Sequence, residues 1–155
     1  MNVGPLTLRK ATIEDAQRLF AWRNDLETRA YSKSHDVLTW ERHSAWLQKV
    51  LNTKSSHLYI AEKEGQPIGT VRGDTLPDGA IEISYTVAPE ARGRGIAKPM
   101  VQQFVREILP PTTRLVAHVQ KGHIPSERVA ESLGLHPMSE PSEKELDQPR
   151  MIEWR

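Results

Sequence analysis

Residues 86–98 read Thr-Val-Ala-Pro-Glu-Ala-Arg-Gly-Arg-Gly-Ile-Ala-Lys. A strand-like run ends at Val87, a turn follows, and a glycine-rich basic loop then opens directly into an amphipathic helix. The first N–H groups of a helix have no internal partner, and the positive end of the helix dipole favours an anion there. Glycine lets the backbone approach phosphate oxygens, while Arg92, Arg94 and Lys98 add positive charge. The stretch therefore predicts a phosphate cradle.

The spacing of this loop excludes two common phosphate-binding motifs. A P-loop requires Gly-x-x-x-x-Gly-Lys followed by Ser or Thr, which the sequence lacks. A dinucleotide-binding fingerprint opens a β-α-β unit, whereas this loop follows four predicted strands. The cradle is therefore of another kind.

Hydrophobic periodicity on both sides of the loop predicts a single α/β domain over residues 1–155. Alternating or continuous apolar runs predict strands at 5–9, 57–61, 67–71, 81–87, 115–119 and 151–154. Helical stripes with capping residues predict helices that begin after Thr12 and Thr39, and others that span 95–109 and 125–133. This order predicts a mixed, mostly antiparallel central sheet with helices on both faces. The proline-rich and acidic segment 136–149 is expected to be a loop.

Charge and composition exclude several classes of protein. Lys plus Arg number 21 and Asp plus Glu number 20, which leaves no concentrated positive field for nucleic acid or for a polybasic membrane anchor. Cysteine is absent, so disulfides, a thiolate nucleophile and cysteine-based metal sites are excluded. The six histidines are scattered without the one-turn pairing typical of zinc sites, so we expect no metal. No long apolar run or signal pattern is present, so we expect a soluble, cytoplasmic protein.

The cradle and its surroundings resemble the GNAT superfamily of N-acetyltransferases. The acetyl-CoA signature of that superfamily, Arg/Gln-x-x-Gly-x-Gly/Ala, is met by residues 92–97, and a strand ending in Val-Ala-Pro precedes it. Downstream, residues 123–135 resemble the helix of the family that reads Asn-x-x-Ser-x-Arg and ends in Leu-Gly-Phe. The order of the predicted elements agrees with the same fold over nearly the whole chain.

The resemblance implies acetyl-CoA as co-substrate and a small-molecule amine as acceptor. The backbone at Val87 would bind the pantetheine arm and polarise the thioester carbonyl, and N–H groups from Gly93 to Lys98 would hold the pyrophosphate. Ser126 and Arg128 would lie beside the far end of the cofactor arm. The implied cofactor-binding set is Val87, Arg92, Gly93, Arg94, Gly95, Ile96, Ala97, Lys98, Ser126 and Arg128. Dimerisation is common in the superfamily, although no residue of this sequence requires a homodimer.

An acceptor amine is mostly protonated at neutral pH, so a base should remove a proton before or during its attack on the thioester. Glu82, on the strand that leads to the loop, is the first candidate, with a simple ion-pair partner as the alternative interpretation. His43 is the alternative base, because the ordinary pKa of histidine is about 6.5. His118, on the next strand, is interpreted as a structural histidine.

Two positions depart from the family pattern. The tyrosine that often protonates the leaving thiolate is replaced by Ala130, and His123 stands where asparagine is usual. Because a thiol has a pKa of about 8.5, an acid helps without being essential. Tyr85 or water is the candidate replacement.

The acceptor side is expected in the amino-terminal half. Trp22, Arg23 and Asn24 offer stacking and bidentate groups suited to a sugar or nucleotide, and His43 joins them as a candidate contact. The alternative interpretation is that the tryptophans fill the space between two helices. The pattern resembles GNAT enzymes that acetylate nucleotide-linked amino sugars, which is the favoured prediction. It is also similar to the ribosomal-protein-alanine branch, and a non-catalytic CoA-binding module is a third hypothesis.

Overall fold

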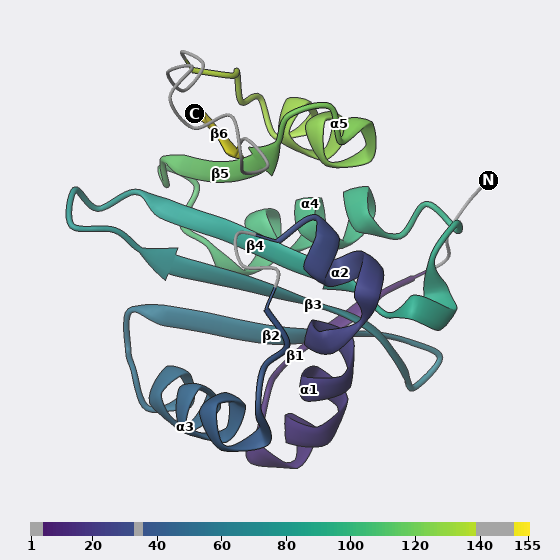
Figure 1. The fold of residues 1–155 in the computed structure, drawn as a ribbon. Coiled ribbons are helices and arrows are strands. Elements are labelled where there is room, and N and C mark those ends of the chain that lie inside the picture. The colour runs from purple at the N-terminus through teal and green to yellow at the C-terminus, as the bar shows by residue number, and fades with distance from the viewer. Residues whose placement is uncertain (1–4, 33–35, 139–150) are drawn as a thin grey trace.

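The computed structural model describes residues 5–32, 36–138 and 151–155, and its centre is a six-stranded sheet in sequential order from β1 to β6 (Figure 1). Neighbouring strands are antiparallel except for β4 and β5, which are parallel. The strands are β1 (Thr7–Lys10), β2 (Ser56–Lys63), β3 (Gln66–Thr75), β4 (Ile81–Val87), β5 (Leu115–Gln120) and β6 (Met151–Trp154). The predicted mixed, mostly antiparallel sheet is confirmed.

Five α-helices and two 3-10 turns are described. Thr12 caps the first turn, η1, and its own N–H donates to the Asp15 carboxylate. Thr39 caps α3 by accepting from the Arg42 N–H. The helical elements are η1 (Ile13–Asp15), α1 (Ala16–Asn24), α2 (Leu26–Ala30), α3 (Trp40–Leu51), η2 (Pro89–Ala91), α4 (Ala97–Ile108) and α5 (Ile124–Ser132). Both capping residues recognised in the sequence therefore begin the helices predicted for them, whereas α2 is an addition that the sequence did not predict.

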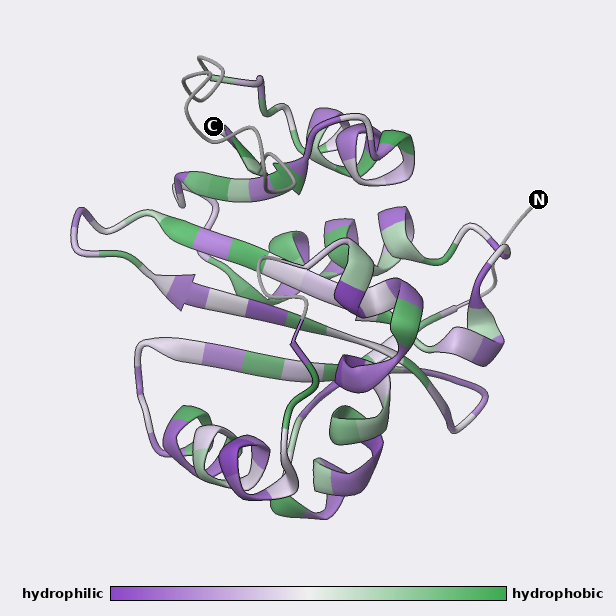
Figure 2. Ribbon diagram, viewed as in Figure 1, coloured by the Kyte–Doolittle hydropathy of each residue, from purple (hydrophilic) through white to green (hydrophobic). Residues whose placement is uncertain are grey.

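Helices cover both faces of the sheet (Figure 1), as predicted. On one face, Phe104 of α4 packs edge-on against Tyr59 of β2, with ring centroids 5.7 Å apart. On the other face, the guanidinium of Arg72 in β3 lies 5.2 Å from the ring centroid of Trp46 in α3. Hydrophobic and hydrophilic bands alternate along the central strands, and hydrophilic colour is prominent on α3 (Figure 2).

The segment expected to be a loop at 136–149 lies outside the described residues from position 139 onward. Its first part is described: Pro137 forms an isolated bridge to Trp154 of β6. The His136 N–H also donates to the carbonyl of Arg155. The chain thus leaves α5 close to the last strand.

The sheet opens between β4 and β5. The two parallel strands pair only from Ile81 with Leu115 to Ile83 with Ala117, although β4 continues to Val87 and β5 continues to Gln120. Beyond this point β4 keeps its pairing with β3 but has no strand on its other side among the described residues. The cavity described below lies at this divergence.

Candidate active site

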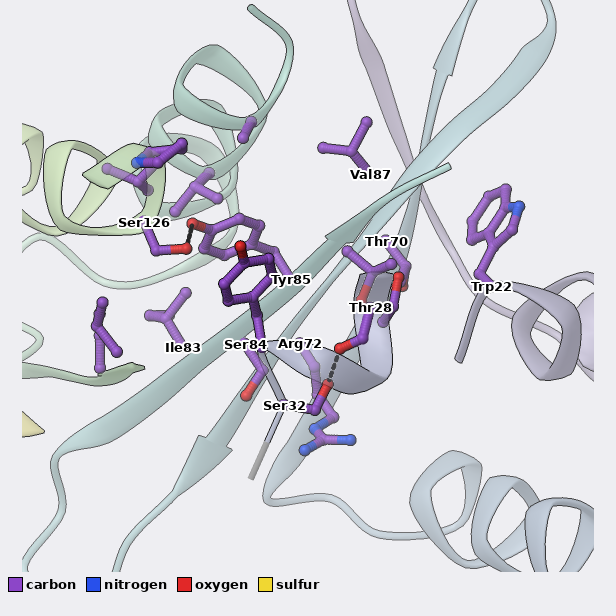
Figure 3. Close-up of a pocket in the computed structure, with 18 of the residues that line it drawn as sticks. Trp22, Thr28, Ser32, Thr70, Arg72, Ile83, Ser84, Tyr85, Val87 and Ser126 are labelled. Carbon is purple, nitrogen blue, oxygen red and sulfur yellow. Dashed lines mark hydrogen bonds between the residues drawn. The ribbon is translucent and has the colours of Figure 1, made fainter. Parts of the chain in front are cut away.

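A cavity of about 600 Å³ fills the divergence between β4 and β5. Its walls come from both strands, from α1, α2 and α3 on one side, and from α5 and the glycine-rich loop on the other. Figure 3 shows side chains from these elements turned toward one space. Segments that are far apart in the sequence therefore meet around a single cavity.

The glycine-rich loop forms the end of the cavity nearest α4. Gly93 and Gly95 have positive φ angles of 76° and 69°, and no heavy atom lies within 4 Å of a Cβ built on either residue. Ile96, which precedes α4, provides no side-chain cap, so the first N–H groups of the helix lack a side-chain partner. The loop thus presents backbone donors toward open space.

The predicted cofactor residues divide into two groups. Those that line the cavity are Val87, Arg92, Gly93, Gly95, Ile96, Ala97 and Ser126. Arg94, Lys98 and Arg128 are exposed and are not part of the cavity wall. These three cations can act on a ligand only from the outer surface.

Arg92 is held by helix α2. Its guanidinium forms ion pairs with Asp25 and with Glu27, the latter at 2.9 Å, and donates to Thr28 Oγ1 at 2.9 Å. The hydrogen bond from Arg92 lowers the pKa of Asp25, which also caps α2 by accepting from the Thr28 N–H. The sequence suggested Arg92 as a charge for phosphate, whereas in the structure this side chain fastens α2 to the loop.

A chain of hydroxyl and imidazole groups crosses the cavity from β4 to α5. The Tyr85 phenol donates to Ser126 Oγ at 3.3 Å (Figure 3), and Ser126 Oγ lies 2.6 Å from His123 Nδ1. Burial raises the pKa of Tyr85 and lowers the pKa of His123. Near neutral pH both groups are therefore uncharged, and the Ser126 hydroxyl can donate to a neutral imidazole.

Helix α2 also meets this chain. The ring of Tyr31, directly after α2, stacks on the His123 ring with centroids 3.7 Å apart and planes 12° apart. Ala130, where the family resemblance leads one to expect a tyrosine, is buried in the cavity wall. Tyr85 reaches Ser126 from the neighbouring strand instead.

Glu82 is paired across the sheet. Its Oε1 lies 2.6 Å from His118 Nδ1, and His118 Nε2 lies 3.7 Å from Glu153 Oε1 on β6. The side chain of Glu82 is 15% exposed, and both Glu82 and His118 line the cavity. The three groups form a carboxylate–imidazole–carboxylate row on adjacent strands, in which His118 fixes the position of the Glu82 carboxylate.

Of the residues predicted to contact the acceptor, three line the cavity and one does not. Trp22, Arg23 and His43 line the cavity, together with Trp46. Asn24 does not, because its amide donates to the Leu38 carbonyl at 2.9 Å and accepts from the Leu38 N–H at 2.8 Å. Its side chain therefore holds the segment that leads into α3.

His43 lies within an aromatic cluster. The rings of Phe20, Trp40 and Trp46 have centroids 5.4, 6.2 and 5.6 Å from the His43 ring. Both ring nitrogens are covered and make no hydrogen bond of good geometry in the described chain, although the backbone of Ala16 favours the protonated ring. Burial outweighs that effect and lowers the pKa of His43, so the ring is neutral near pH 7.

Several cavity residues were not recognised in the sequence, among them Tyr31, Thr28 and Arg72. Tyr31 and Thr28 belong to the short α2 region, for which Asp25 followed by Glu27 was an available capping signal. Arg72 lies inside a strand that was predicted only as far as position 71. Whether the Arg72 side chain reaches the cavity depends on which face of the sheet it occupies.

Two features are absent from the described chain. No group of three or more His, Asp or Glu residues is placed to hold a metal ion within 5–32, 36–138 and 151–155. None of the helices in these ranges is long and apolar enough to cross a membrane.

Comparison with known proteins identifies the class to which this fold and site belong. The family model described as acetyltransferase (GNAT) domain matches residues 5–136. The chain therefore belongs to the GNAT acetyltransferase family, and it is an N-acetyltransferase.

Solved structures show the same fold at low identity. An N-acetyltransferase from Staphylococcus aureus Mu50 is 21% identical with a TM-score of 0.79, over 97% of this chain and 96% of that chain. Ribosomal-protein-alanine N-acetyltransferase from Brucella melitensis is 22% identical with a TM-score of 0.78, over 96% of this chain and 97% of that chain. An aminoglycoside acetyltransferase in complex with coenzyme A is 19% identical with a TM-score of 0.76, over 97% of this chain and 94% of that chain. No curated protein matches the sequence significantly.

Proposed function

We propose that this protein transfers an acetyl group from acetyl-CoA to a primary amine by direct attack within a ternary complex. The observation that carries the proposal is the opening between β4 and β5, which joins a glycine cradle to a carboxylate in one cavity. Because the chain has no cysteine, a thiol-based acyl-enzyme is excluded. Direct attack requires mainly that the amine and thioester be oriented, together with a base and an acid.

The cradle suits the anionic end of acetyl-CoA. The uncapped N–H groups before α4 and the open space at Gly93 and Gly95 fit a pyrophosphate. Val87 belongs to the part of β4 that has no partner strand on one side, and the amides of the pantetheine arm would bind to its backbone there. The solved aminoglycoside acetyltransferase of the same fold contains coenzyme A, which supports this assignment.

Glu82 is the proposed base. Its carboxylate lies in the cavity wall and is positioned by His118, so it can accept a proton from an ammonium group or from an intervening water. His43 is less suited, because both of its ring nitrogens are covered by the surrounding aromatic rings. A substrate amine cannot reach them without displacing that cluster.

Tyr85 is the proposed source of the proton for the leaving thiolate. Its phenol stays protonated because burial raises its pKa, and it forms a hydrogen-bonded chain with Ser126 and His123. His123 lies at the outer end of this chain, where a proton can be replaced. Tyr85 on β4 would thus protonate the leaving thiolate, the role that the family resemblance gives to a tyrosine at the position of Ala130.

We propose an amino sugar, free or nucleotide-linked, as the acceptor. The cavity wall opposite the cradle combines tryptophan with arginine side chains, which suits the faces and polar groups of sugars. One protein of the same fold is named an aminoglycoside acetyltransferase. A protein N-terminus is the alternative acceptor, since another is named a ribosomal-protein-alanine N-acetyltransferase.

Titration calorimetry with acetyl-CoA, followed by thiol-release assays on amino sugars, polyamines and short peptides, tests the proposal. Glu82→Gln should reduce kcat by about 100-fold or more while acetyl-CoA still binds. Glu107→Gln is the matched control, because Glu107 is exposed on α4 and outside the cavity. Equal rates for the two variants would remove Glu82 from the mechanism, and failure to bind acetyl-CoA would refute the proposal as a whole.

A further inference from the structure

Arg23 is a charged side chain that faces the cavity without a counter-charge. It lies in the last turn of α1 and is half-buried. Across the described chain it forms no ion pair and no side-chain hydrogen bond. Burial lowers the pKa of Arg23, and the neighbouring positive charge of Arg72 lowers it further. The charged group that acts on Arg23 is therefore another cation, Arg72.

Arg72 leaves most of its donors directed away from protein acceptors. It lies in the middle of β3, where hydrophilic bands interrupt the strand (Figure 2), and it enters the cavity beside Ser84 (Figure 3). Its Nε donates to Asp74 at 2.8 Å, and its guanidinium lies over the Trp46 ring. Neither terminal nitrogen makes a hydrogen bond within the described part of the chain.

Arg72 is paired with Asp74 through its Nε, so Arg23 is the uncompensated positive charge in a cavity that both arginines line. Buried charges in proteins are normally paired, and arginine cannot become neutral by losing its proton. The planar guanidinium donates two parallel hydrogen bonds to a carboxylate or a phosphate. We propose that Arg23 and Arg72 bind an anionic group of the acceptor, a carboxylate or a phosphate, and so select amines that carry one.

This inference rests on the proposed acetyl transfer. The sheet register places Arg72, proposed to bind the anion, at a suitable position relative to Glu82, the proposed base. Arg72 pairs with Ser84, and Asp74 pairs with Glu82, so Arg72 and Glu82 are diagonal neighbours on one sheet face. Such diagonal positions are about 7 to 8 Å apart. An acceptor can therefore contact Arg72 through its anion while its amine approaches Glu82, and the cofactor phosphates occupy the cradle at the other end.

The test compares amines that differ only in the anion: glucosamine with glucosamine 6-phosphate, and butylamine with γ-aminobutyrate. The wild-type protein should favour the anionic member of at least one pair by about tenfold or more in kcat/KM. The pair that shows the preference distinguishes phosphate from carboxylate. Arg23→Gln should abolish it, while Arg18→Gln should not, because Arg18 lies on the same helix but pairs with Asp15 outside the cavity.

A second measurement needs no turnover. With the cradle saturated by CoA, inorganic phosphate or acetate should raise the melting temperature of the wild-type protein and of Arg18→Gln, but not of Arg23→Gln. Equal anion effects and equal amine preferences in all three proteins would overturn the inference and leave the acetyl transfer intact. A weaker affinity of Arg23→Gln for acetyl-CoA would also overturn it, by assigning Arg23 to the cofactor. Absence of acetyl-CoA binding in the wild-type protein would instead refute the proposed function.

Discussion

Replacing Gly95 with alanine should weaken acetyl-CoA binding with little effect on the rest of the fold. Gly95 has a φ of 69°, and a Cβ built on it meets no heavy atom within 4 Å. Among the described residues beyond its two chain neighbours, the methyl group would therefore clash with nothing, but it would point into the open space that the proposal assigns to the pyrophosphate. The structural cost is the left-handed backbone alone, which is about 1 kcal/mol for an L-residue.

Gly134 provides a matched control. It follows α5 with a φ of 82°, a Cβ there also meets nothing within 4 Å, and the residue lies outside the cavity. Gly134→Ala should therefore lose about as much stability as Gly95→Ala. For a chain of this size, 1 kcal/mol corresponds to a decrease of about 2 to 4 °C in melting temperature.

The binding effect should be confined to Gly95→Ala. Displacing a phosphate oxygen from one backbone N–H costs about 1.5 to 3 kcal/mol, the range for hydrogen bonds to charged groups. Because each tenfold change in Kd corresponds to about 1.4 kcal/mol, this loss predicts a Kd for acetyl-CoA that is roughly 10- to 100-fold higher. Titration calorimetry measures the Kd and differential scanning fluorimetry measures the melting temperature. Equal affinities for acetyl-CoA in the two variants would refute the cradle.

Tyr85→Phe should reduce kcat by about tenfold or more and change the Kd for acetyl-CoA little, because it removes only the hydroxyl that contacts Ser126. Stopped-flow thiol release should show the defect shrinking above pH 8.5, where a thiolate leaves without protonation, and an unchanged kcat would return the role to water. His43→Phe should raise stability by about 1 kcal/mol, because both buried ring nitrogens lack a well-placed partner. The pKa of His43 is lowered in the folded state. Below about pH 6.5 the histidine is therefore protonated more readily in the unfolded chain than in the folded chain, so the free energy of unfolding decreases as the pH falls. Urea unfolding at pH 5 and 7 should show a smaller pH effect in His43→Phe, and an equal effect would contradict this reasoning.

The predicted elements agree with the structure where local chemistry decides them. Thr12 and Thr39 begin helices because each side chain accepts from a backbone N–H of its own first turn. The strand predicted at 81–87 has the same bounds in β4. Periodicity and capping act within a few residues, so they are legible without knowledge of the tertiary structure.

Helix α2 has a capping signal at Asp25 but no apolar stripe to support it. It has five residues, none buried, and Leu26 is 74% exposed, so it has no apolar stripe. Its contacts come from Arg92, 67 positions beyond Asp25, and from the stacking of Tyr31 on His123. A partner this distant leaves no local periodicity in the sequence.

The candidate site shows the same division. The glycine-rich loop before α4 could be located because glycine spacing and a following helix form a local signal. Asn24 was expected to contact the acceptor, yet its amide donates to and accepts from the backbone of Leu38. Arg23, also expected to contact the acceptor, lines the cavity, and its charged neighbour there is Arg72 from the strand β3. Residue type suggests what a side chain can do, and only the packing decides which neighbour it meets.

The divergence of β4 from β5 gives this sheet an edge in its interior. Beyond Ile83, one side of β4 carries backbone donors and acceptors with no strand beside them in the described chain. An exposed edge of this kind on a protein surface invites pairing with another chain. Here residues of α2 and α5 line the cavity beside this edge. The amides on this edge should exchange hydrogen quickly in the free protein and become protected when a ligand takes the place of the missing strand.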